Sequence, residues 1–168
     1  AVAGRYAGRV DAWDVVNEAL ADDGTLRDTF WLRCIGPDYI EKAFRWAHAA
    51  DPSAKLFYND YGIESPGEKA EAAFNLVNDL KKKGVPIHGI GLQMHLDRIP
   101  ADRFLADYMQ RFADIGIEVH VTEMDVRLPM PLQARDVSMQ SDAYRMVMRR
   151  CVEAPNCLST LSIVLNTF

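Results

Sequence analysis

The sequence predicts an α/β protein whose strands form one parallel sheet. Short apolar runs rich in β-branched and aromatic residues alternate with longer segments in which apolar residues recur at helical spacing. Alternating strands and helices are typical of βαβ units, which place successive strands parallel to one another. Polar, chemically reactive residues follow the apolar runs, at the position where α/β folds gather their active sites.

Each expected strand is a short apolar run bounded by turn residues. The first run contains Trp13, Val15 and Val16 and is followed by polar residues. Such side chains favour an extended backbone because they pack well on a pleated surface. The five expected strands span residues 12–16, 55–58, 89–92, 117–121 and 160–164.

Four helices are expected in the segments between and beside these strands, and their ends carry typical start and stop residues. Asp38 suits the N-cap of the first helix, and the Asp51-Pro52 pair ends it. Gly84 and Gly116 stand where a helix end favours a left-handed backbone. The helices are expected over residues 38–50, 68–83, 100–115 and 136–152, and residues 21–36 are expected to form a loop.

A parallel β/α sheet is either an open, doubly wound sheet or a closed barrel. A complete eight-unit barrel needs about 250 residues and is rarely shorter than about 200. This chain of 168 residues has room for about five β/α units, so a barrel would be present only in part. No G-x-G-x-x-G or P-loop sequence follows any expected strand, which argues against a nucleotide-binding domain.

Charge and composition exclude several classes of partner. The 19 basic and 24 acidic residues give a net charge of −5, and the longest basic run is Lys81-Lys82-Lys83, so a nucleic-acid partner is not expected. No apolar stretch approaches the ~18 residues that a membrane span needs. Of the three cysteines, Cys151 and Cys157 are six residues apart and are either a disulfide or two free thiols.

Four groups of reactive side chains each follow one of the first four expected strands. Because the carboxyl ends of parallel strands meet at one edge of the sheet, these groups are expected to converge there. The groups are Asn17 with Glu18, Asn59 with Asp60 and Tyr61, Gln93 with His95, and Thr122 with Glu123 and Asp125.

Two glutamates, Glu18 and Glu123, directly follow strongly apolar strands. Either one alone reads as an ordinary solvated loop carboxylate. A pair on one edge of a parallel sheet is what glycosidic cleavage requires, because one carboxyl protonates the leaving oxygen while the other attacks the anomeric carbon. The sequence therefore contains a pair of carboxylates that such a cleavage could use.

Four sequence blocks resemble the signatures of glycoside hydrolase family 10, the endo-1,4-β-xylanases. The resemblance runs from about residue 5 to residue 157, with the blocks in the family's order. The blocks are Trp13-Asp14-Val15-Val16-Asn17-Glu18-Ala19, Tyr58-Asn59-Asp60-Tyr61, Gly91-Leu92-Gln93-Met94-His95 and Thr122-Glu123-Met124-Asp125-Val126-Arg127.

This resemblance implies an incomplete parallel (β/α) TIM barrel, with about five of eight units, and specific roles for its residues. Glu18 is expected to be the general acid/base and Glu123 the nucleophile of a retaining, endo-acting cleavage of β-1,4-xylosidic bonds in xylan. His95 is expected to orient Glu123, and no cofactor or metal is expected. Substrate contacts are implied for Asn17, Asn59, Tyr61, Gln93 and His95, with Asp60 and Asp125 in support.

The resemblance also implies a disulfide between Cys151 and Cys157 and a secreted protein, although the chain itself shows no signal peptide. The family's first three β/α units are absent, and its Trp-Gly pair after the last strand is missing. We therefore expect a partial catalytic domain over residues 1–158 and a divergent tail over residues 159–168.

These departures lead us to expect weak or no activity from the chain alone, and self-association through exposed barrel edges. Two alternatives stay open on the sequence. One is a fragment that binds xylo-oligosaccharides without cleaving them. The other is a metal-dependent barrel hydrolase in which His95, His120, Glu123 and Asp125 cluster.

Overall fold

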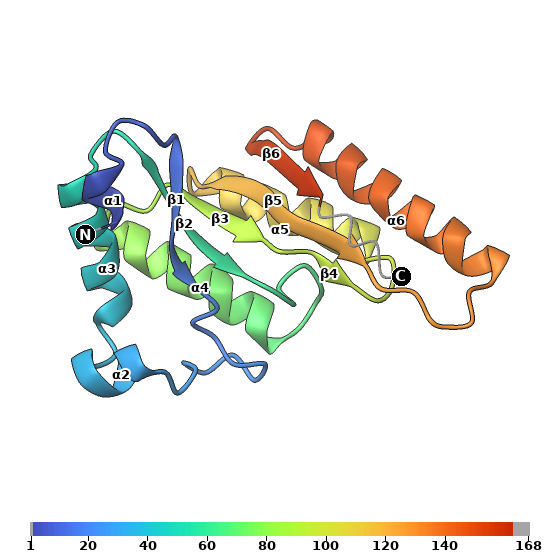
Figure 1. The fold of residues 1–168 in the computed structure, drawn as a ribbon, viewed down its shortest axis with the longest axis horizontal. Coiled ribbons are helices and arrows are strands. Elements are labelled where there is room, and N and C mark those ends of the chain that lie inside the picture. Colours follow the sequence, from blue (N-terminus) through green and yellow to red (C-terminus); the bar gives the residue numbers. More distant parts are fainter. Residues whose placement is uncertain (1, 163–168) are drawn as a thin grey trace.

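The computed structural model describes residues 2–162 and contains one six-stranded sheet in which every pair is parallel (Figure 1). The strand order is β1-β2-β3-β5-β6, and the short β4 pairs with the end of β5. The strands are β1 (Ala12–Asn17), β2 (Lys55–Asp60), β3 (Gly89–Leu92), β4 (His95–Leu96), β5 (Glu118–Val126) and β6 (Cys157–Ser162).

Helices cover one face of this sheet. In Figure 1, α4 and α5 cross behind the strands, and the near face of the sheet carries no helix. The apolar stripe of α4, which includes Ala73, Val77 and Leu80, is buried against the strands' covered face. The helices are α1 (Val2–Arg5), α2 (Phe30–Ile35), α3 (Tyr39–Ala50), α4 (Glu68–Lys82), α5 (Asp102–Asp114) and α6 (Ala134–Glu153). Among residues 2–162, no helix is long and apolar enough to cross a bilayer.

The first four expected strands and all four expected helices are present, but the expected loop over residues 21–36 is wrong in part. Residues 30–35 form α2, which starts because the Thr29 side chain accepts the backbone N–H of Leu32 at 3.1 Å. Six residues are too few to show a helical period, and the first two, Phe30 and Trp31, remain exposed. The two-residue β4 was not expected from the sequence either.

The C-terminal strand begins earlier than expected. β6 spans Cys157–Ser162, whereas the sequence predicts a strand over residues 160–164; residues 163 and 164 lie outside the described residues. A disulfide joins Cys151 at the end of α6 to Cys157 at the start of β6, with 5.1 Å between the two Cα atoms. The expected boundary at residue 158 falls inside β6, and the last six residues of the expected tail are outside the described part.

Strand register brings the polar strand ends side by side. Asn17 of β1 is paired with Asn59 of β2, which is paired with Gly91 of β3. Gly91 permits this close approach, because a Cβ added there would overlap the Asn59 amide oxygen and lie 2.9 Å from Thr122 Cγ2. The sheet thus gathers the side chains of three strands at one edge.

Candidate active site

Glu18 is positioned by a sharp change of backbone direction at the end of β1. Its N–H donates to the Asn59 carbonyl at 2.8 Å and extends the β1–β2 ladder by one step. Its φ of 55° then lies in the left-handed region, which non-glycine residues seldom occupy. Such backbone geometry is found preferentially at functional sites. The turn leaves the Glu18 carboxylate at the carboxyl edge of the sheet with about a third of its side chain exposed.

Asn59 is the centre of the hydrogen-bond network at this edge. Its side chain is 2% exposed, and its Nδ2 donates to Asn17 Oδ1 and to Glu123 Oε1, both at 2.9 Å. The Thr122 hydroxyl donates to Asn59 Oδ1 at 2.8 Å, which fixes the orientation of the amide. Asn59 thereby connects β1 to β5.

Gln93 completes the link between the two glutamates. The side chain is buried, and its Nε2 donates to Asn17 Oδ1 at 3.1 Å and to Glu18 Oε1 at 3.2 Å. Glu18 and Glu123, 105 positions apart (123 − 18), therefore belong to one hydrogen-bonded network through three amide side chains.

His95 lies between two carboxylates. Its Nε2 is 3.4 Å from Glu123 Oε2, and its Nδ1 is 3.2 Å from Asp125 Oδ2. The β4–β5 register pairs His95 with Asp125, and the chain reaches β4 through Met94, whose φ is 61°. The ring is thus held in place by its own strand, at a position from which it contacts Glu123.

Tyr61 and Asp60 stand outside the amide network, and Tyr61 is linked to Glu18 through Arg27, which donates to both side chains. Asp60 is fully buried; it accepts the hydroxyl of Tyr58 and the backbone N–H of Tyr61, and it lies 2.9 Å from Lys69 Nζ. The same Lys69 ammonium stands 3.3 Å from the Tyr61 ring centroid, a cation–π contact. Asp60 thus helps to place Tyr61, both through its backbone N–H and through the Lys69 ammonium that contacts its ring.

Two charged residues at the site were missed by the sequence reasoning. Arg27 Nη1 lies 3.0 Å from Glu18 Oε2, although Arg27 belongs to a segment read only as a loop. Asp14 keeps solvent contact, yet the surrounding protein reduces its hydration and raises the pKa of its carboxyl, with the Glu123 charge as the second cause. A carboxylate inside the otherwise apolar first strand was a signal that could have identified Asp14.

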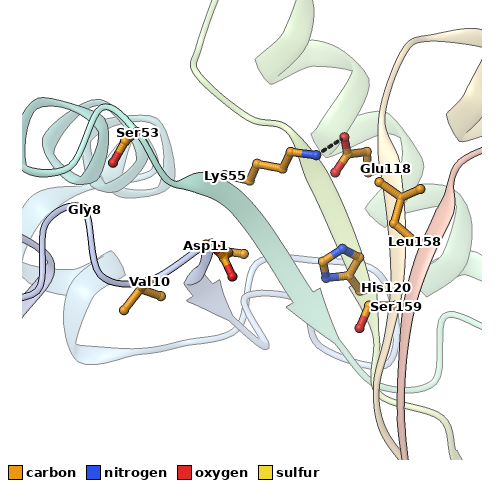
Figure 2. A pocket seen from close by; sticks show the side chains of 10 residues that line it. Gly8, Val10, Asp11, Ser53, Lys55, Glu118, His120, Leu158 and Ser159 are labelled. Carbon is orange, nitrogen blue, oxygen red and sulfur yellow. Dashed lines mark hydrogen bonds and ion pairs between the residues drawn. The ribbon is translucent and has the colours of Figure 1, made fainter.

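A hollow of about 660 Å³ lies at the other end of the strands, where β1, β2 and β5 begin (Figure 2). Lys55 and Glu118 pair across it at 2.6 Å, and His120 lines it. Its lining residues are Gly8, Val10, Asp11, Ala12, Ser53, Lys55, Glu118, His120, Leu158 and Ser159. This hollow is distinct from the edge that carries Glu18.

The metal-dependent alternative lacks a ligand set in the described part of the chain. Between residues 2 and 162, no group of three or more His, Cys, Asp or Glu side chains is arranged to hold a metal ion. His95, Glu123 and Asp125 are neighbours, but His120 lines the opposite end of the sheet.

A parallel sheet with helices on one face and a polar network at the carboxyl ends of its strands defines an α/β protein of the barrel type. The family model for glycosyl hydrolase family 10 matches residues 1–163, and the chain belongs to this family. The fold class expected from the sequence, an incomplete (β/α) barrel, is confirmed.

Known relatives place the chain more closely. It is 44% identical over 157 residues to endo-1,4-beta-xylanase B of Thermotoga neapolitana, covering 92% of this chain and 45% of that protein. Xylanase 10B of Thermotoga petrophila, solved in complex with xylobiose, superposes with a TM-score of 0.93 at 41% identity, covering 96% of this chain and 50% of that one. An intracellular xylanase of Thermoanaerobacterium saccharolyticum superposes at 0.86 with 39% identity, covering 96% and 51%. The chain spans about half the length of these relatives.

Proposed function

We propose that this chain carries the two catalytic glutamates of a retaining endo-1,4-β-xylanase, with Glu18 as general acid/base and Glu123 as nucleophile. The observation that carries the proposal is the continuous network from Glu18 through Gln93, Asn17 and Asn59 to Glu123. The network holds both carboxylates at one edge of the sheet, as a reaction at a single glycosidic bond requires. The xylobiose complex of the Thermotoga petrophila relative supports a xylo-oligosaccharide substrate.

The proposed reaction has two steps. In the first, the Glu18 carboxylic acid gives its proton to the glycosidic oxygen, which keeps the electron pair of the breaking C1–O bond, while the Glu123 carboxylate forms a new bond to C1. In the second, Glu18 takes a proton from water, and the water oxygen displaces Glu123 from C1. Both steps need Glu123 held at a fixed angle, and Asn59 and His95 contact its two oxygens.

Supporting roles follow from the same contacts. Asn17 projects from the strand end between Glu18 and Asn59 and is exposed, so its amide is available to a sugar hydroxyl. Tyr61, beside Glu18, is proposed to contact the sugar on the leaving-group side. Asp125 is proposed to hold His95, which in turn holds Glu123.

The test uses a chimaera in which this chain replaces the matching segment of the Thermotoga neapolitana xylanase. Release of reducing sugar from xylan is measured for the chimaera and for Glu123→Gln, which we expect to lower kcat/KM by more than about 10³-fold. Glu118→Gln is the matched control, because Glu118 lies on the same strand at the opposite end and should change kcat/KM by less than about threefold.

Activity of the Glu123→Gln chimaera equal to that of its parent would refute the assignment. The chain alone is expected to release little or no reducing sugar, because it spans about half the length of the Thermotoga neapolitana xylanase. Robust turnover by the chain alone, lost in Glu123→Gln, would refute that expectation. Saturable binding of xylotetraose without cleavage by the active-site-intact chimaera would favour the binding-fragment alternative.

Self-association of the chain alone is a further proposal. Within residues 2–162, β1 pairs with β2 only and β6 with β5 only, so each leaves one edge of unpaired backbone groups. Light scattering after size-exclusion chromatography should give a mass above that of one chain. A monomer at every concentration would contradict the proposal.

Secretion is proposed on the basis of the Cys151–Cys157 disulfide, since structural disulfides persist mainly in oxidising compartments. Alkylation of the protein recovered from its natural host, followed by mass spectrometry, tests it. Modification of one cysteine per chain is expected, and modification of all three would contradict it.

A further inference from the structure

The loop after β1 is folded so that Arg27 returns to the start of the loop. Leu20 and Leu26 form an antiparallel bridge, the Ala21 N–H donates to the Thr25 carbonyl at 2.8 Å, and the Arg27 N–H donates to the Ala19 carbonyl at 2.8 Å. These backbone bonds close a narrow turn over residues 19–27. The backbone therefore places Arg27 beside Glu18, which precedes it by nine positions in the chain.

The guanidinium of Arg27 joins two residues of the proposed site. Nη1 donates to Glu18 Oε2 at 3.0 Å, and Nη2 donates to the Tyr61 hydroxyl at 2.9 Å and to the Leu20 carbonyl at 3.4 Å. Two nitrogens of one rigid, planar group thus fix the separation of a carboxylate and a phenol. Because a lysine offers a single nitrogen on a flexible stem, it could not hold both partners in this way.

The partners of Arg27 are themselves held from other elements. The Tyr61 hydroxyl donates to Asp22 at 3.1 Å, and Lys69 packs on the Tyr61 ring. Glu18 accepts from Gln93 on its other oxygen. The guanidinium stays charged at working pH: partial burial disfavours the charge, but Tyr61 and Glu18 outweigh burial and raise the pKa of Arg27.

We propose that Arg27 is a positioning residue, which holds the Glu18 carboxylate at a fixed position relative to a leaving-group sugar that packs on Tyr61. The inference rests on the proposed function of Glu18 and Tyr61. When Glu18 gives its proton to the glycosidic oxygen it becomes negatively charged, and Arg27 is the cation that faces this new charge. Arg27 therefore matters most when the leaving group needs a proton, and little when it does not.

This difference supplies the test. The same chimaera is assayed on xylan and on 2,4-dinitrophenyl xylobioside, whose acidic phenol departs without protonation. For Arg27→Met, we expect kcat/KM on xylan to fall about 10–100-fold and kcat/KM on the aryl substrate to fall less than about threefold. Arg27→Lys should recover only part of the loss, because it cannot reach both partners. Arg45→Gln, an exposed arginine on α3 with an ion pair to Glu41, is the matched control and should behave as the parent.

Equal losses on both substrates, or no loss on xylan, would overturn the proposal. Thermal unfolding of each variant is measured alongside, to recognise a variant that has lost kcat/KM equally on both substrates because it is misfolded. That result also counts against a positioning role. Tyr61→Phe removes only the hydroxyl contact. It should raise KM on xylan by a larger factor than it lowers kcat. Failure of the proposed function itself is separate, since it would appear as full activity of Glu123→Gln whatever Arg27 does.

Discussion

Replacing Gly91 with alanine tests how tightly the sheet packs beneath the proposed active site. The added Cβ would overlap Asn59 Oδ1, and it would lie 3.0 Å from Asn59 Cγ and 2.9 Å from Thr122 Cγ2. Ordinary carbon contacts begin near 3.4 Å, so the buried Asn59 amide must shift and strain its three hydrogen bonds. Overpacking of this kind costs about 1–3 kcal/mol, and weakening the network brings the expected loss of unfolding free energy to about 2–3 kcal/mol.

Urea denaturation of the chain, followed by circular dichroism, measures this loss. Gly67→Ala is the control, because an added Cβ there meets no atom within 4 Å, and the loss of glycine from the N-cap of α4 should lower the unfolding free energy by less than about 1 kcal/mol. In an Asn59→Ala background, Gly91→Ala should cost about 1 kcal/mol less than in the parent, since the colliding amide is gone and only the close contact with Thr122 Cγ2 remains. Equal costs in the two backgrounds would refute the reasoning, because the strain would then not pass through Asn59.

Two further predictions concern the stability of the chain. Reduction of the Cys151–Cys157 disulfide, which closes a loop of sequence separation 6, should lower the unfolding free energy by ~2 kcal/mol, whereas Cys34→Ser at an exposed thiol should not; equal effects in urea denaturation would contradict this. The pKa of His88 is lowered, first by burial, and its Nδ1 accepts the Leu56 N–H at 3.0 Å, so the unfolded chain takes up the proton more readily. Stability should fall as pH drops below about 6.5, and His88→Asn should flatten this dependence in thermal melts from pH 7 to pH 5; an unchanged slope would contradict the assignment.

The sheet and its main helices could be predicted because their signals are local. Apolar runs marked β1, β2 and β3, and the periodicity of segments such as 68–83 marked the helices, with burial following the apolar face. The elements that were missed depend on tertiary contacts. β4 exists only because two residues after the turn at Met94 find partners on β5, and α2 is too short to show a period.

The same distinction applies to the candidate site. Residues directly after strands could be predicted because parallel strands present their carboxyl ends at one edge, and the structure brings Glu18, Asn59 and Glu123 together there. Arg27 could not be predicted in this way, because only the closure of its loop places it beside Glu18. The register of the strands decides which side chains at the site can form hydrogen bonds with one another. The sequence alone does not reveal the bulge between Asp14 and Val16 that sets the register of Asn17.

The proposed roles of the two glutamates are tested most directly by trapping the intermediate. The chimaera is incubated with 2,4-dinitrophenyl 2-deoxy-2-fluoro-xylobioside, whose fluorine slows both steps and whose good leaving group still permits the first. Peptide mass spectrometry should then find one fluoroxylobiosyl group on Glu123, and Glu18→Ala should still be labelled because this leaving group needs no proton. Label on any other residue, or hydrolysis with inversion and no label on Glu123, would contradict the account.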